Sequence, residues 1–134
     1  MQEPHAFPEA LTPARLTVDA ALIAAYAELT QDFNPIHLDA DFAASTPMGG
    51  VIAHGTMSIG LVWQSIERSL GTAALTEADL DIRFIKPVRL GEALVAGGQR
   101  RAGSPHAYEV WVRSEHDNSD RLVGSVLIEP APSA

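Results

Sequence analysis

The sequence contains no cysteine, and this absence excludes several kinds of site. Disulfide bridges, zinc ribbons, iron–sulfur clusters and thiol nucleophiles all require cysteine side chains. Basic residues are also scarce, with 9 lysines and arginines against 17 aspartates and glutamates, which gives a formal net charge of −8. Nucleic acids and anionic lipid surfaces are bound by clustered positive charge, so we expect neither nucleic acid nor a membrane as a partner.

No run of apolar residues approaches the roughly 18 that a membrane-spanning helix needs. The N-terminus carries prolines and an acidic residue where a signal peptide would carry basic residues and then an apolar run, so we expect a cytoplasmic protein. A chain of 134 residues has room for one domain. The composition of its ends predicts a flexible N-terminus at 1–9, a single domain at 10–130 and a flexible C-terminal tail at 131–134.

Apolar residues at helical spacing predict two helices. The first covers about 18–31, with Thr17 as its N-cap, and it ends at an Asp-Phe-Asn-Pro turn because proline disfavours helix in the residue before it. The second begins near Gly55 and ends before Gly71, the expected C′ glycine. This second helix is apolar on nearly all sides for most of its length, so we expect it to be deeply buried.

The hydrophobic period changes from 3.6 to 2 after the second helix. Four stretches of alternating apolar and polar residues, separated by turn residues, predict an antiparallel sheet. These stretches begin near Leu80, Leu94, Tyr108 and Leu122. A further short strand is expected within 10–17. One buried helix followed by a sheet long enough to curl around it makes an α+β domain.

The segment between the two helices is the first candidate site. Residues 36–54 look irregular apart from one helical turn around 39–45, and long ordered loops in small domains often hold sites. Asp32 and His37 lie on a proline-stiffened turn, where a carboxylate and an imidazole can hold one water and supply a base and an acid. In the alternative interpretation, Asp32 and Asn34 only form the turn and His37 packs or caps.

The pair His54-Gly55, at the start of the buried helix, is the second candidate. The first N–H groups of a helix have no intrahelical partners, and the helix dipole places partial positive charge there. Because glycine has no side chain, a carbonyl oxygen that gains negative charge can approach the Gly55 N–H closely. The alternative is that Gly55 only eases a tight turn into the helix.

A metal site has weak support in the sequence. His37, Asp39, Asp41 and His54 can be combined into a set of ligands, but such a set is easily found by chance. No HExxH-like helical spacing is present, and the oxygen-rich central segment lacks the glycine and the closing glutamate of an EF-hand. We therefore expect no metal.

Phosphate-binding motifs are equally sparse. The sequence has no glycine-rich loop of the nucleotide-binding types, and we expect no cofactor. Lys86, with Arg83 and Arg89 near it, is the closest approach to a phosphate-contacting cluster. Ordinary strand and loop charges remain the favoured interpretation of these three residues.

The motifs resemble those of the MaoC-like dehydratases, the group that contains the (R)-specific enoyl-CoA hydratases. The resemblance rests on the segments AYAELTQDFNPIHLDADFA, GGVIAHGTMSIGL and RFIKPVRLGE, and it covers about 16–130. The combination of D-F-N-P-x-H-x-D with a following H-G is far more specific than either half. The resemblance implies a hot-dog fold, in which a long central helix is wrapped by a curled antiparallel sheet.

This resemblance also implies a reaction. Water is added to the double bond of a trans-2-enoyl thioester, carried by CoA or by an acyl-carrier protein, to give an (R)-3-hydroxyacyl thioester, or the reverse. Asp32 and His37 would be the catalytic pair, and Asn34 would fix the pair by hydrogen bonding. Gly55 would donate its N–H to the thioester carbonyl. The sequence does not decide which member of the pair takes the proton from water.

Substrate-binding roles extend to neighbouring residues in this interpretation. His54 adjoins the carbonyl site, and Tyr26 and Trp63 are candidate walls for an acyl chain, although such residues are more often simply core. Thr56 departs from the family, whose members frequently have methionine directly after the His-Gly pair, and the change bears on the pocket entrance.

Two alternative functions remain open on the same fold: an acyl-CoA thioesterase and a non-catalytic protein that binds acyl thioesters. The presence of both Asp32 and His37 counts against the non-catalytic alternative. We also expect a homodimer or a higher homo-oligomer, because one helix wrapped by one sheet leaves apolar surface and sheet edges open.

Overall fold

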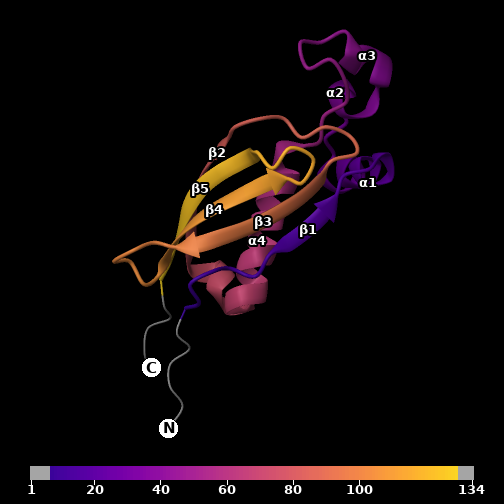
Figure 1. Ribbon diagram of the computed structural model, residues 1–134. Helices are drawn as coiled ribbons and strands as arrows, with labels where there is room; N and C mark the ends of the chain where they lie inside the picture. The colour runs from indigo at the N-terminus through magenta and orange to yellow at the C-terminus, as the bar shows by residue number, and fades with distance from the viewer. Residues whose placement is uncertain (1–6, 130–134) are drawn as a thin grey trace.

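The computed structural model describes residues 7–129 and shows a long helix packed along a curled antiparallel sheet (Figure 1). This is the expected α+β hot-dog arrangement. The elements in chain order are β1 (Ala14–Thr17), α1 (Ala20–Thr30), α2 (Pro35–Leu38), α3 (Ala40–Ala44), α4 (Gly55–Leu70), the 3-10 helix η1 (Thr72–Glu77), β2 (Ala78–Phe84), β3 (Ala93–Arg100), β4 (Ala107–Ser114) and β5 (Asp120–Ile128).

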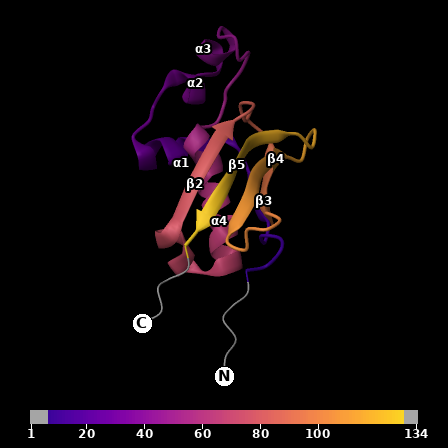
Figure 2. The same ribbon diagram turned by 90° about the vertical axis from the view of Figure 1, so that its left-hand side faces the viewer.

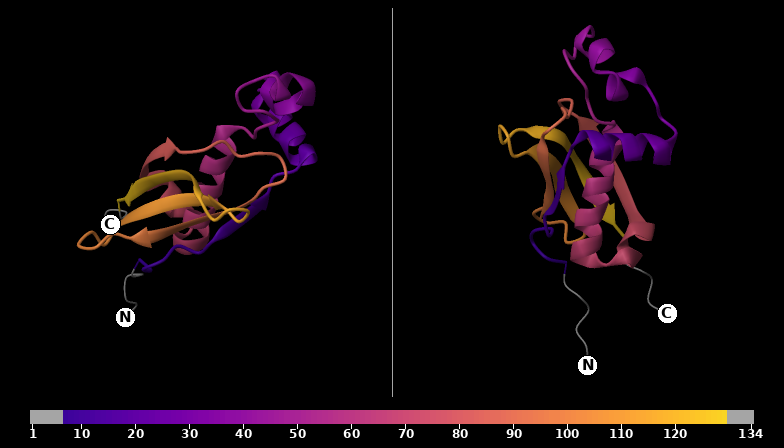
Figure 3. Two further views of the ribbon diagram at one scale, coloured as in Figure 1. Left: turned by 45° about the horizontal axis from the view of Figure 1, so that its top comes forward. Right: turned by 90° about the vertical axis from the view of Figure 1, so that its right-hand side faces the viewer.

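The sheet has five strands in the order β1-β3-β4-β5-β2, and every neighbouring pair is antiparallel. Helix α4 lies along one face of the sheet, as the right-hand view of Figure 3 shows. Leu61, Val62 and Ile66 of α4 are buried, and so are the inward side chains of the strands, including Val112 and Leu122. The predicted strands are confirmed. The deep burial predicted for this helix is found on one face only, because Gln64 is exposed and Ile59 and Trp63 are only half-buried. Within residues 7–129, no helix has the length and apolar character needed to cross a bilayer.

The predicted helix ends are partly confirmed. Gly71 follows α4 with φ 87°, as expected for a glycine at this position. The prediction of Thr17 as the N-cap of the first helix was wrong, because Thr17 is the last residue of β1 and pairs with Ala93. Asp19 caps α1 instead, and its side chain accepts a 2.7 Å hydrogen bond from the Leu22 N–H.

The segment between α1 and α4 is more ordered than the sequence predicted. The expected turn of helix is present as α3, but Pro35–Leu38 also forms a helical turn, α2, in a stretch expected to be irregular. Asn34 caps α2, since its side chain accepts a 3.1 Å hydrogen bond from the Ile36 N–H. Figure 2 shows that α2 and α3 stand away from the sheet, beyond the end of β2.

The expected flexible ends fall largely outside the described residues, which leave out 1–6 and 130–134. Residues 7–9 are described, and they are hydrogen-bonded to the sheet. The Tyr108 hydroxyl donates to the carbonyl of Pro8 at 2.6 Å, and the Arg100 N–H donates to the carbonyl of Glu9 at 2.7 Å.

A buried ion pair between Arg121 and Glu92 joins β5 to the residue that precedes β3. The register of β4 with β5 skips Arg121, because Arg113 pairs with Asp120 while Val112 pairs with Leu122. The irregularity turns the Arg121 side chain away from the outer face, where strict alternation would place it. Arg121 is 6% exposed and Glu92 is 8% exposed, and Asp117 lies 3.2 Å from the same guanidinium.

Electrostatics favour the charged form of this pair. Burial by itself raises the pKa of the Glu92 carboxyl, but hydrogen bonds from Arg121, from the Arg89 N–H and from Ser114 outweigh it and hold the pKa below its ordinary value. The Arg121 carbonyl also accepts a 2.9 Å hydrogen bond from the Ile85 N–H. The ion pair thus fixes the chain that follows β2.

We predict that Glu92→Gln lowers the free energy of unfolding at neutral pH by about 3 kcal/mol, because it leaves a buried guanidinium with a weaker partner. The folded-state pKa of Glu92 lies below its ordinary value of 4.5, so its stabilising contribution is complete above that pH. The contribution is lost as the pH falls through the lower folded-state pKa. Urea titrations at several pH values measure both effects.

The matched control for this prediction is Glu115→Gln, which removes the exposed pair of Glu115 with Arg15. Exposed pairs contribute about 0–1 kcal/mol, so this variant should remain close to the parent. Equal stabilities of the two variants at neutral pH would contradict the assigned role of the buried pair.

Candidate active site

The first turn of α4 offers an N–H group with no partner. Gly55 is the first helical residue, and within residues 7–129 no acceptor is recorded for its N–H. Phe84 covers this position, because two of its ring carbons lie 3.2 Å from where a Cβ on Gly55 would stand. Gly55 is not among the positive-φ residues of the described chain, so its role is close approach rather than unusual backbone conformation.

Asp32 follows directly after the end of α1. Gln31 ends this helix with φ 59°, and the Asp32 N–H then donates to the carbonyl of Ala27 at 3.2 Å. The Asn34 N–H lies 3.3 Å from the carboxylate Oδ1 of Asp32. The Asp32 side chain is exposed. Its backbone N–H and its carboxylate both form hydrogen bonds, the first to Ala27 and the second from Asn34.

His37 lies on α2, which Asn34 caps. Its Nδ1 atom is 2.7 Å from the carbonyl oxygen of Ile52. A carbonyl oxygen only accepts hydrogen bonds, so Nδ1 carries the proton and Nε2 is the free nitrogen of the neutral ring. The cap and the carbonyl together orient His37 with Nε2 left for a ligand.

Asp32, His37 and His54 form one cluster. The rings of His37 and His54 are stacked, with centroids 3.9 Å apart and an interplanar angle of 27°. A carboxylate oxygen of Asp32 and one ring nitrogen from each histidine all lie within 4.8 Å of one another. Of the metal-ligand set considered from the sequence, His37 and His54 are brought together, with Asp32 as a third possible ligand, whereas Asp39 and Asp41 do not join this group among the residues that the structure describes.

A pocket of about 330 Å³ opens beside this cluster. His37, His54 and Gly55 form part of its lining, which brings the imidazoles and the helix N-terminus to one cavity. The rest of the lining is mostly apolar and comes from the loop before α4 and from the chain after β2. These further residues are Met48, Ile52, Ala53, Ser58, Phe84, Ile85, Lys86, Pro87, Val88 and Arg121.

Tyr26 and Trp63 do not line this pocket. Tyr26 lies behind it: its hydroxyl donates to the Thr56 Oγ1 at 2.6 Å, and its ring is 5.1 Å from that of His54. Thr56 therefore binds Tyr26 where family members often have methionine. Trp63 is half-buried against the core, two turns further along α4.

The sequence missed Arg121 and Ser58 as pocket residues. Arg121 follows directly after the predicted turn Asp117–Asp120, and the register irregularity that turns it inward has no signal in the alternating pattern. Ser58 lies on α4 three residues after Gly55. A polar residue one turn into a buried apolar helix was a signal that could have identified it.

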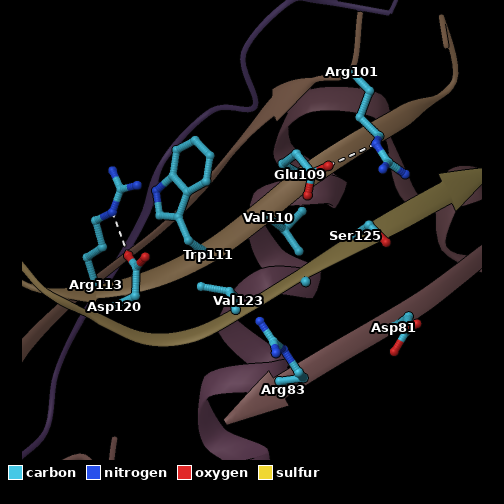
Figure 4. Close-up of a pocket in the computed structure, with 11 residues that line it drawn as sticks. Asp81, Arg83, Arg101, Glu109, Val110, Trp111, Arg113, Asp120, Val123 and Ser125 are labelled. Carbon is cyan, nitrogen blue, oxygen red and sulfur yellow. Dashed lines mark hydrogen bonds and ion pairs between the residues drawn. The ribbon is translucent and has the colours of Figure 1, made fainter. Parts of the chain in front are cut away.

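The three cations considered for phosphate binding are dispersed. Lys86 lines the pocket, whereas the Arg89 guanidinium donates to the carbonyl of Met48. Arg83 lines a different hollow of about 360 Å³ on the outer face of the sheet (Figure 4). Of the three, only Lys86 could meet a ligand in the pocket.

The outer hollow is balanced in charge. Arg101 pairs with Glu109 at 2.8 Å and Arg113 pairs with Asp120 at 2.7 Å (Figure 4). The Arg113 guanidinium also stacks 4.3 Å from the ring centroid of Trp111. Arg101 and Arg113 are paired to carboxylates, and the third arginine, Arg83, shares the hollow with Asp81, so this face has no excess of positive charge for an anionic ligand.

The chain is similar in sequence and in fold to several known proteins. A 3-hydroxybutyryl-CoA dehydratase from Methylorubrum extorquens is 36% identical over 56% of this chain and 48% of that protein. Nodulation protein N from Rhizobium meliloti is 34% identical over 82% of this chain and 76% of that protein. The solved structure of an (R)-hydratase from Aeromonas caviae, involved in PHA biosynthesis, is 28% identical, with a TM-score of 0.72 over 92% of this chain and 98% of that one.

The aligned part of the chain spans about half of the length of the M. extorquens dehydratase. The model of the MaoC like domain family matches residues 6–116 of this chain. This match includes the cluster of Asp32, His37 and His54 together with Gly55. The chain therefore belongs to the MaoC-like dehydratase family.

Proposed function

We propose that this protein is a hydro-lyase that adds water to a trans-2-enoyl thioester to give an (R)-3-hydroxyacyl thioester, or catalyses the reverse reaction. The observation that carries the proposal is that His37, which is clustered with Asp32, lines one largely apolar pocket together with Gly55 and its unpaired N–H. The names of the relatives, a CoA-thioester dehydratase and an (R)-hydratase, support this reaction class and CoA as the carrier.

Activation of the substrate falls to the N-terminus of α4. Water adds poorly to an isolated double bond, but a polarised thioester carbonyl makes C3 electrophilic. The Gly55 N–H and the partial positive charge of the helix end stabilise the enolate oxygen that develops as water attacks. Phe84 packs against Gly55 and adds an apolar ring beside the carbonyl-binding position.

The proton transfers fall to His37, with Asp32 orienting the water. Neutral His37 presents its Nε2 lone pair, which takes one proton from the water as the oxygen bonds to C3. The Asp32 carboxylate accepts a hydrogen bond from the same water. The imidazolium then returns the proton to C2, so the two hydrogens and the oxygen of one water are all accounted for. Asn34 supports both residues, through its cap on α2 and its N–H to Asp32.

Substrate binding is proposed to use the apolar pocket wall for the acyl chain. Met48, Ile52 and Val88 supply this wall, and Lys86 stands where it can meet the phosphates of a carrier. Tyr26 and Trp63 act in this proposal as supports behind α4 instead of as direct walls.

One assay separates this function from its alternatives. Loss of enoyl absorbance with crotonyl-CoA, without release of free thiol, is the expected result. Thiol release from a saturated acyl-CoA would point to a thioesterase, and binding without either reaction would point to a non-catalytic protein. Activity that vanished with a chelator and returned with added zinc would contradict the proposed use of Asp32 and His37.

We predict that Asp32→Asn and His37→Ala each lower kcat for crotonyl-CoA hydration by about 10²–10⁴-fold, because general acid–base groups typically contribute that much. Circular dichroism should be unchanged. Asp41→Asn and His116→Ala are matched controls, since both residues are exposed and lie outside the cluster. Near-parental turnover in the Asp32 or the His37 variant would refute the assignment.

The role of the Gly55 N–H can be tested by removing its hydrogen. Gly55→Pro does so at the first helical position, where proline is tolerated, and His54 at φ −63° and ψ 133° already has a backbone that proline accepts after it. We predict a loss in kcat of about 10²–10³-fold. Gly55→Ala keeps the N–H and brings the same Cβ against Phe84, so it should lose much less. Equal losses in the two folded variants would place the carbonyl-binding group elsewhere.

We also propose that the protein is a homodimer whose second copy covers the segment around α2 and α3. Phe33, Leu38 and Phe42 are exposed large apolar side chains on this segment, which stands away from the sheet. Burying such side chains is favourable by about 25 cal/mol per Å² of apolar surface. A second copy would also brace the turn that carries His37.

We predict that light scattering at micromolar concentration gives the parent twice the chain mass of 14.3 kDa. The double variant Leu38→Asp, Phe42→Asp should give the mass of a single chain, because it places charges in the proposed interface. Leu127→Asp is the control, since Leu127 is similarly exposed but lies on β5. A single-chain mass for the parent would overturn the dimer.

A further inference from the structure

The His54 side chain connects the two halves of the proposed catalytic pair. Its Nε2 lies 3.0 Å from the backbone carbonyl oxygen of Asp32, and its ring stacks on that of His37 at 3.9 Å. His54 itself precedes Gly55, the residue with the unpaired N–H. No other side chain among residues 7–129 is recorded in contact with both Asp32 and His37.

The same side chain is poorly placed to bind substrate. It is 4% exposed, and although its ring forms part of the pocket lining, neither nitrogen is available there. Nε2 must carry the proton, because the Asp32 carbonyl can only accept a hydrogen bond. Nδ1 is enclosed and has no hydrogen-bond partner in the described chain, so a proton on that atom would have no acceptor.

We propose that His54 is a positioning residue, which sets the separation and the orientation of Asp32 and His37 and does not bind the substrate. This inference rests on the proposed hydratase function. It differs from the expectation drawn from the sequence, where His54 was grouped with the substrate-binding residues.

Two contacts give His54 this role. The hydrogen bond to the Asp32 carbonyl adds a second anchor to the backbone just beyond the left-handed residue Gln31, where the Asp32 N–H is already bonded to Ala27. The stacking of the two rings limits tilting of the His37 ring about its hydrogen bond to the Ile52 carbonyl. Tyr26 supports the other side of His54, with ring centroids 5.1 Å apart.

Substitution of His54 is therefore expected to lower the catalytic rate without changing the affinity for the substrate. Misplacing catalytic groups by about 1 Å can cost about 10²-fold in rate. A group that acts only through the geometry of the reacting residues lowers kcat and leaves KM nearly unchanged.

Three substitutions separate the two contacts. His54→Gln keeps an N–H donor at about the same reach and loses the ring. His54→Phe keeps the ring and loses the donor, and His54→Leu loses both. With crotonyl-CoA we expect the Leu variant to lose about 10²-fold in kcat with KM within about two-fold. The Gln and Phe variants should each recover part of that loss.

The control for general destabilisation is Ser65→Ala. Ser65 is a buried polar residue of the same helix, and its hydroxyl also donates to a backbone carbonyl, that of Thr12, at 2.6 Å. It lies far from the pocket, so its variant should lower the melting temperature and leave kcat unchanged. Unchanged kcat in His54→Leu with a similar loss of stability would overturn the proposal, and so would a raised KM with kcat retained.

A measurement on the parent protein needs no variant. Nitrogen-15 NMR of the histidine rings should show the proton of His54 on Nε2 and a bare Nδ1, and a proton on Nδ1 would refute the arrangement. If His54→Leu fails to fold, the Gln and Phe variants decide, since kcat equal to that of the parent in both would overturn the role. Absence of any hydration by the parent would instead reject the proposed function, which keeps the two failures distinct.

Discussion

The burial of α4 against the sheet is the constraint on which the rest of the structure depends. A helix that is apolar on most sides must be enclosed, and the sheet curls far enough to cover it only on one side. The N-terminal end of the helix then meets the chain that enters it and the chain that follows β2. Gly55 thus leaves an N–H without a partner beside an apolar pocket, where its partial charge is poorly screened.

The histidines meet a second constraint, which is the need of backbone carbonyl groups in the loop segments for hydrogen-bond donors. The carbonyl of Ile52 takes its donor from His37, and that of Asp32 takes its donor from His54. Each hydrogen bond requires that one ring nitrogen carries the proton. The bonds that satisfy the backbone carbonyl groups therefore also set the tautomer of each histidine. The same contacts that order the loop prepare His37 to accept a proton at Nε2.

Local patterns in the sequence were sufficient for much of this arrangement. The period of 3.6 defined α4 and the period of 2 defined the strands, because burial on one face repeats with the geometry of each element. Gly71 ended α4 as expected. Asp32, His37 and Gly55 were identified as candidates because a proline-stiffened turn and a helix start have their own chemical signatures. The structure places His37 between the other two, since it is clustered with Asp32 and lines the pocket with Gly55.

The sequence by itself therefore determined the two long helices, the strands and their buried faces, and it named the candidate acid–base residues. Tertiary structure decided which side chains share a cavity, because distances between separate segments have no local signal. It placed Trp63 and Tyr26 outside the pocket lining and turned Arg121 inward through an irregularity in pairing. Tertiary structure also buried His54 against Asp32 and His37. Only the packing of α1, α2 and α4 together determines which atom each ring nitrogen of His54 faces.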